Sequence, residues 1–106
     1  MTETLIPTID EARGEAAGLN LRTQLFIGGE FREAAGGRRF VTENPATGQP
    51  IAGVAEGGPA DVDAAVAAAR RAADSGIWSR MNPGDRKRIL IRWADLIETN
   101  ARELGL

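Results

Sequence analysis

The sequence holds few side chains that could carry out chemistry. Among its 106 residues there is no Cys, His or Tyr, and Lys87 is the only lysine. Without Cys there is no thiolate nucleophile, disulfide or thiolate metal site. Without His, the usual acid–base group at neutral pH and the commonest metal ligand are both missing. This composition favours a binding module or a part of something larger.

The carboxylates are not spaced as a catalytic acid–base pair. Asp61 and Asp63 are two residues apart and therefore do not share a face of a helix. Asp95 and Glu98 are three residues apart, but they lie beside arginines that we expect to be exposed. We predict no catalytic residue from spacing alone.

Oxygen atoms just before a turn suggest a weaker possibility. Thr42 and Glu43 precede Asn44-Pro45 and could offer hydroxyl and carbonyl oxygens to a hard cation. Two oxygens do not make a cation site by themselves.

Paired glycines raise the question of a phosphate-binding loop. They occur at 28–29, 36–37 and 57–58, but no complete phosphate-loop motif is present. The pair at 57–58 joins a strand-like run to a helix start, which is a geometry that suits an anion. However, Pro59 removes one amide and Asp61 would repel a phosphate. We therefore interpret these glycines as turn residues.

Charge and hydropathy exclude two broad classes. The formal net charge is −2, so we interpret the basic run around residues 80–92 as a solvated helix face and not as a nucleic-acid site. The longest apolar run, Ala64 to Ala69, is too short to span a membrane. The acidic start, Met1-Thr2-Glu3, lacks the pattern of a secretion signal, and we expect a cytoplasmic protein with no nucleic-acid or membrane partner.

The first half of the chain predicts an arm followed by strands. Residues 1–23 are expected to form a flexible arm with at most a short helical turn, because Pro7, Gly14 and Gly18 interrupt helical patches. Strand-like runs then follow at 25–27, 30–31, 40–42 and 50–55. Gly28-Gly29 indicates a two-residue hairpin turn, and the runs together predict an antiparallel β-meander.

The second half predicts helices. The first starts at Pro59 and stops at Gly76, with Arg70 and Arg71 in its last turns. A second begins at Asn82-Pro83 and carries an apolar face.

A third helix is predicted near the end of the sequence. Asn100 and Glu103 have the spacing of a capping box. Only six residues follow Asn100, so this helix looks truncated.

Taken in order, several segments resemble the N-terminal part of the NAD(P)-dependent aldehyde dehydrogenase superfamily. The resemblance covers residues 24–106. Its motifs include Leu25-Phe26-Ile27-Gly28-Gly29-Glu30-Phe31, Glu43-Asn44-Pro45-Ala46-Thr47-Gly48, Asp61-Val62-Asp63-Ala64-Ala65-Val66 and Trp78-Ser79-Arg80-Met81. From Gly76 to Ile97 the chain is most similar to the branch that acts on aminoaldehydes and γ-glutamyl-aminobutyraldehyde.

The resemblance implies an α/β fold in which residues 24–106 form part of a Rossmann-like cofactor domain, with residues 1–23 as an arm. It also implies a homo-oligomeric enzyme that oxidises an aldehyde with NAD or NADP by thiolate attack, hydride transfer and thioester hydrolysis. The catalytic Cys, the Glu that activates water, the oxyanion-hole Asn and the nicotinamide-binding loops are expected beyond Leu106. Thr42 and Glu43 align with the family's structural monovalent-cation site, of which this chain would hold only a part.

Two hypotheses remain open at this point. In the first, the chain is a scaffold within an aldehyde dehydrogenase, inactive and without bound cofactor on its own, whose partner is the remainder of the enzyme. In the second, it is a free-standing interaction module that docks through the face formed by Ile89, Trp93 and Leu96.

Overall fold

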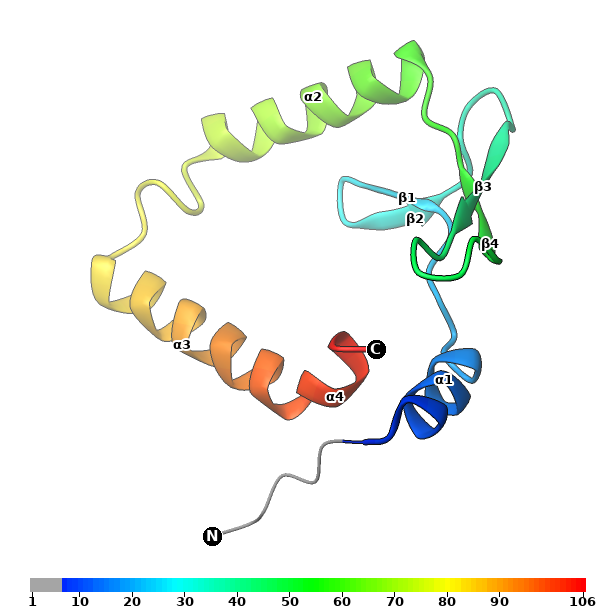
Figure 1. Ribbon diagram of the computed structural model, residues 1–106. Helices are drawn as coiled ribbons and strands as arrows, with labels where there is room; N and C mark the ends of the chain where they lie inside the picture. Colours follow the sequence, from blue (N-terminus) through cyan, green and yellow to red (C-terminus); the bar gives the residue numbers. More distant parts are fainter. Residues whose placement is uncertain (1–6) are drawn as a thin grey trace, which may run out of the picture. The chain divides into compact units, whose positions relative to one another are not determined.

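The computed structural model describes residues 7–106 and contains four helices and four short strands in that range (Figure 1). Contacts divide the chain into two compact units. One is Leu21–Met81, which holds all the strands and α2. The other combines α1 (Ile9–Ala17) with α3 (Pro83–Thr99) and α4 (Ala101–Leu104). Each unit is described by itself.

The first hairpin pairs β1 (Leu25–Ile27) with β2 (Glu30–Arg32). Gly28 and Gly29 form the two-residue turn with φ of 64° and 84°, values that suit glycine and match a hairpin turn. Phe26 lies opposite Phe31 with ring centroids 4.8 Å apart, and the guanidinium of Arg22 lies 4.6 Å from the Phe31 ring. The sequence prediction of this hairpin is confirmed.

The second hairpin pairs β3 (Arg39–Glu43) with β4 (Pro50–Ala55). Its turn is organised by Asn44, whose side-chain oxygen accepts from the amide of Ala46 at 2.9 Å. The Asn44 carbonyl accepts from the amide of Gly48 at 2.7 Å, and Gly48 has φ of 69°. The Asn-Pro-x-x-Gly turn therefore forms as predicted.

The strands pair as two separate hairpins and not as one continuous meander. The loop between β2 and β3 turns on itself, with the amide of Gly37 donating to the carbonyl of Ala34 at 2.8 Å. Thr23 and Arg39 supply the links between the hairpins. The carbonyl of Thr23 accepts from the amide of Ala55 at 2.8 Å, and Arg39 donates to the Thr23 hydroxyl at 2.9 Å and to the Gly53 carbonyl at 2.8 Å.

Helix α2 spans Pro59–Ser75 with Gly58 as its N-cap, and Gly76 ends it in the left-handed region (φ 70°). Both ends agree with the sequence prediction. Arg70 and Arg71 lie in the last two turns of α2 as predicted, but the final turn holds no basic residue to neutralise the C-terminus of the helix. Arg80 takes that role from beyond the helix, donating to the Ser75 carbonyl at 2.5 Å.

Helix α1 spans Ile9–Ala17 and corrects the prediction of at most a short helical turn. Thr8 and Glu11 form a reciprocal capping box, in which the Thr8 amide donates to the Glu11 carboxylate at 2.8 Å. This cap stabilises the helix start by an amount comparable to the cost of about 1 kcal/mol for Gly14 inside the helix. Residues 1–6 of the predicted arm lie outside the described residues.

Helix α3 spans Pro83–Thr99, and the Asn82 side chain caps it by accepting from the amide of Gly84 at 2.8 Å. Helix α4 spans Ala101–Leu104. The predicted capping box at its start is wrong, because Asn100 instead donates its side-chain amide to the Leu96 carbonyl at 2.7 Å. Asn100 thus completes α3, and its side-chain oxygen accepts no capping hydrogen bond from α4.

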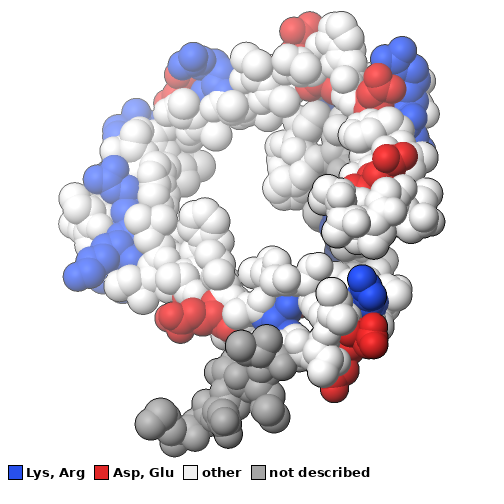
Figure 2. Space-filling model, viewed as in Figure 1, with Lys and Arg blue, Asp and Glu red and all other residues white. Residues whose placement is uncertain are grey.

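Few side chains are buried in either unit. Among the described residues, Ala34, Ala55 and Asp61 are the buried ones, whereas large apolar side chains such as Trp93 and Phe26 are more than half exposed. Figure 2 shows basic side chains on one side of α3 and uncharged atoms over its other side. None of the helices that the structure describes combines the length and hydropathy needed to cross a membrane.

Candidate functional site

The most strongly positioned charged group is the carboxylate of Asp61, in the first turn of α2. Its side chain is buried, with the residue only 7% exposed. One oxygen accepts from the amide of Gly58 at 2.9 Å, and the other accepts from the amide of Ala35 at 3.0 Å. A single carboxylate therefore joins the start of α2 to the loop between β2 and β3.

These two hydrogen bonds lower the pKa of Asp61. The bond from the Gly58 amide is the larger cause and the bond from the Ala35 amide the second, whereas burial acts in the opposite direction. The ionised form is also favoured at a helix N-terminus, where main-chain amides point outward.

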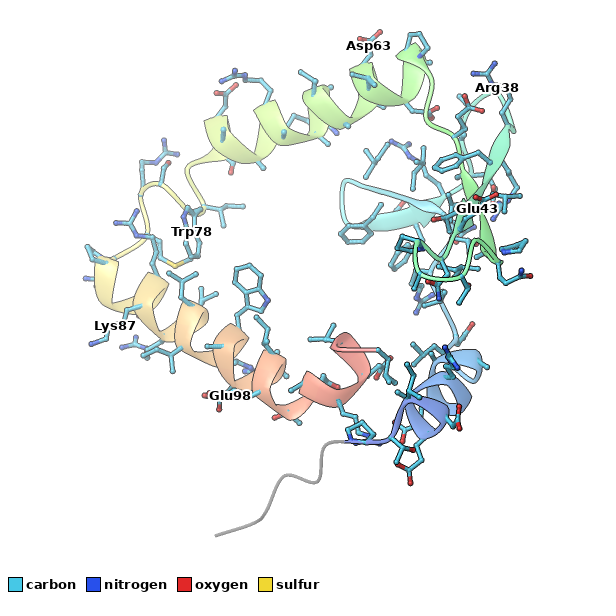
Figure 3. The ribbon with its side chains drawn as sticks, viewed as in Figure 1. Arg38, Glu43, Asp63, Trp78, Lys87 and Glu98 are labelled. Atoms are coloured by element: carbon cyan, nitrogen blue, oxygen red, sulfur yellow. The ribbon has the colours of Figure 1, made fainter. Side chains whose placement is uncertain are left out.

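The start of α2 is not available as an anion site, because the Asp61 carboxylate already accepts a hydrogen bond there. Asp61 supplies the negative charge that a phosphate would otherwise bring to the Gly57-Gly58 junction. The interpretation of these glycines as turn residues therefore agrees with the geometry. Asp63, two residues further on, is exposed and points away from the hairpins of its unit (Figure 3). The two carboxylates thus have different environments and do not form an acid–base pair.

The candidate cation ligands lie at the end of β3. Thr42 is half-buried and Glu43 is exposed, near the turn that joins β3 to β4 (Figure 3). The strand pairing shifts between these two residues, so that Thr42 lies opposite Ala52 and Glu43 lies opposite Pro50. Pro50 has no N–H to donate to a main-chain oxygen of β3.

The donor set at this position fits a hard cation in type but not in number. A hydroxyl and main-chain carbonyls are ligands that such ions accept. No cluster of three or more His, Cys, Asp or Glu side chains occurs anywhere in residues 7–106, so carboxylates do not complete the set. Thr42 and Glu43 can form only part of a site.

The groove beside the β1–β2 turn in the strand-containing unit offers little chemistry. It lies between this turn and α2, and it is lined mainly by Gly28, Gly29 and alanines, with Arg71 at its edge. None of its lining residues is an acid, a base or a nucleophile that could act at neutral pH. The scarcity of reactive groups inferred from composition thus holds for this groove as well.

Comparison with known proteins assigns the chain to a family. Residues 31–106 match the model of the "Aldehyde dehydrogenase family". This chain belongs to the aldehyde dehydrogenase family. The resemblance found in the sequence motifs is therefore confirmed.

A curated relative extends the match over the whole chain. The aminoacetaldehyde dehydrogenase of Pseudomonas aeruginosa is 45% identical over 106 residues, which cover 100% of this chain and 21% of the relative. The chain thus spans about a fifth of the length of this relative.

Solved structures of the family share the fold. A γ-glutamyl-γ-aminobutyraldehyde dehydrogenase from Burkholderia cenocepacia gives a TM-score of 0.83 at 46% identity, covering 89% of this chain and 19% of that one. The P. syringae indole-3-acetaldehyde dehydrogenase, in complex with NAD⁺, gives 0.86 at 41% identity, with coverages of 93% and 20%. These matches confirm the α/β assignment to the N-terminal part of aldehyde dehydrogenase structures.

We predict that Asp61→Ala will release the β2–β3 loop from α2, whereas Asp63→Ala will not. The first change leaves two amides without their acceptor, so amide exchange at Ala35 and Gly58 should become about tenfold faster or more. Unchanged exchange at Ala35 in the Asp61 variant would contradict the assigned role. Exposed Asp63 is the matched control because it lies on the same helix turn.

The same contact predicts a pH dependence. The pKa of Asp61 is lower in the folded chain than in the unfolded chain, so its stabilising effect is present at neutral pH. That effect is lost as the pH falls below about 4 and through the folded pKa. The amide resonances of Ala35 and Gly58, followed by NMR in acid titration, should shift together in the wild type and lose this transition in Asp61→Asn.

Proposed function

We propose that this chain supplies the N-terminal scaffold of an NAD(P)-dependent aldehyde dehydrogenase, an enzyme that oxidises an aldehyde to a carboxylic acid. The observation that carries the proposal is the alignment of the entire chain with the P. aeruginosa aminoacetaldehyde dehydrogenase at 45% identity. Residues 24–106 would form part of a Rossmann-like cofactor domain and residues 1–23 an arm.

In this proposal the reactive groups lie in the four-fifths of the family length that this chain does not span. The chain has no Cys, so the thiolate expected from the family resemblance must come from elsewhere. NAD or NADP, when bound, would accept the hydride, and no residue of this chain is assigned to it. The role of residues such as Asp61 and Arg39 is to hold hairpins and helix in place.

The proposal extends to the substrate class, the location and the oligomeric state of the enzyme. The names of the P. aeruginosa and B. cenocepacia relatives favour an aminoaldehyde or a γ-glutamyl-aminobutyraldehyde as substrate. A cytoplasmic location and a homo-oligomeric enzyme stay predictions of the sequence and its family resemblance.

The exposed apolar face of α3 supports a scaffold role. Ile89, Trp93 and Leu96 are 46%, 62% and 53% exposed, although they share one helix face. An apolar stripe of this kind stabilises a fold only when another element covers it. The remainder of the enzyme, about four times the length of this chain, would supply that cover.

A hybrid enzyme tests the proposed function. This chain replaces the matching segment of the P. aeruginosa aminoacetaldehyde dehydrogenase, and NADH formation from aminoacetaldehyde is measured by absorbance. We expect the hybrid to have a kcat within about tenfold of the parent, because the scaffold is of the same fold. The isolated chain and the parent without the segment should form no NADH.

Two results would overturn the proposal. Turnover by the isolated chain would place the chemistry within these 106 residues. A hybrid that melts cooperatively but has no activity would show that this chain does not fit the family's active enzyme.

A thermal melt separates the scaffold from a free-standing module. We expect the isolated chain to aggregate or to lose its signal without a cooperative transition, because so little of its apolar surface is buried. A sharp, reversible transition from a monomer would instead favour the interaction module that docks through Ile89, Trp93 and Leu96.

We further propose that Thr42 and Glu43 contribute to a structural monovalent-cation site completed by oxygens from the rest of the enzyme. The interrupted strand pairing at these residues supports this assignment. In the hybrid, K⁺ should raise the melting temperature, and Thr42→Val should reduce that increase because it removes the hydroxyl. Thr47→Val is the control. Equal responses to K⁺ in the wild-type hybrid and the Thr42 variant would contradict the assignment.

A further inference from the structure

Helix α1 is held in its unit by very little packing. None of its residues is buried, and Ile9, its large apolar residue, is 66% exposed. Its capping box lies between Thr8 and Glu11, at its own N-terminus, and does not connect the helix to another element. Some other contact must therefore hold α1 against the rest of its unit.

That contact is an ion pair between Glu15 in α1 and Arg102 in α4. The Nε of Arg102 donates to one carboxylate oxygen at 2.7 Å, and an Nη donates to the other oxygen. The pair is therefore bidentate, and it joins residues 87 positions apart. The pKa of Glu15 is lowered by its hydrogen bond from Arg102, and the pKa of Arg102 is raised by the same bond.

Beside the ion pair there is open space between α1 and the junction of α3 with α4, which we call the seam. A groove of about 440 Å³ runs along it, lined on the α1 side by Gly14, Glu15 and Gly18 and on the other by residues that include Thr99 and Arg102. A Cβ added at Gly14 would meet nothing within 4 Å. The glycines thus leave space beside the ion pair, and Leu19 and Leu106 are the large apolar residues that line it.

We propose that α1 is a detachable strap fastened by the Glu15–Arg102 pair. The Arg102 and Glu15 side chains are 53% and 41% exposed, so salt can screen their attraction. Release would leave α1, a nine-residue helix, without a partner, and a helix this short unfolds readily on its own, so its amides would exchange faster. Helix α1 precedes residues 31–106, which match the family model, whereas Arg102 lies within them.

Hydrogen–deuterium exchange of peptides from α1 tests the strap. Measurements are made on the full 106-residue chain and on the hybrid enzyme, at about 0.05 M and about 0.5 M NaCl. In the wild type, high salt should speed exchange in α1 by about two- to fivefold, the range expected for an exposed ion pair. Peptides from α2 serve as an internal reference and should not respond.

Charge-reversal variants distinguish loss of the Glu15–Arg102 ion pair from a general loss of structure. Glu15→Arg and Arg102→Glu should each speed exchange in α1 at low salt and remove its salt response. Arg102 lies outside α1, so its variant cannot act through the helix propensity of α1. The double variant should restore protection, whereas the control Glu103→Gln, a neighbouring exposed residue, should behave as wild type.

The outcomes are separable from those of the proposed function, because exchange in α1 is read independently of NADH formation. Restored protection in the charge-swapped chain supports the strap. Exchange in α1 that is equally fast in the wild type and both single variants, in both proteins, overturns it. Failure of the double variant to regain protection overturns it as well.

Discussion

The strand-containing unit depends on one buried carboxylate. Asp61 accepts hydrogen bonds from Gly58, at the start of its own helix, and from Ala35, in a loop 26 residues earlier. Both amides would be costly to leave without an acceptor, so the loop and the helix start are fixed together. The charge that could have attracted a ligand is used to hold the fold.

The remainder of the chain is poorly buried. Backbone hydrogen bonds, caps and turns are satisfied locally, whereas large side chains such as Trp93 and Val66 stay more than half exposed. Local structure of this quality without a matching core is what a segment of a larger fold should show, since elements form their hydrogen bonds internally but bury their apolar faces against neighbours. In the proposed scaffold role, the remainder of the enzyme would cover these apolar faces, since the compared family members are about five times longer than this chain.

Polar groups at two further places, the candidate cation site and the seam beside α1, take part in the two proposals. Thr42 and Glu43, the proposed cation ligands, lie where the strand pairing shifts its register. Glu15 and Arg102 form a bidentate pair across a seam that glycines leave open. At both places the polar groups come from, or would need, more than one segment of the chain: the proposed cation site needs further oxygen ligands, and the ion pair needs both α1 and α4.

The sequence by itself determined the elements that depend on near neighbours. Gly28-Gly29, Asn44 to Gly48, Pro59 and Gly76 specified turns and helix ends, because the physical causes lie within a few residues. The ordered motifs also identified the family. Only the tertiary structure decided that the strands form two hairpins, that Arg80 caps α2 and that Asp61 reaches Ala35. Main-chain amides are present at every residue except proline, so sequence cannot say which of them a distant carboxylate will meet.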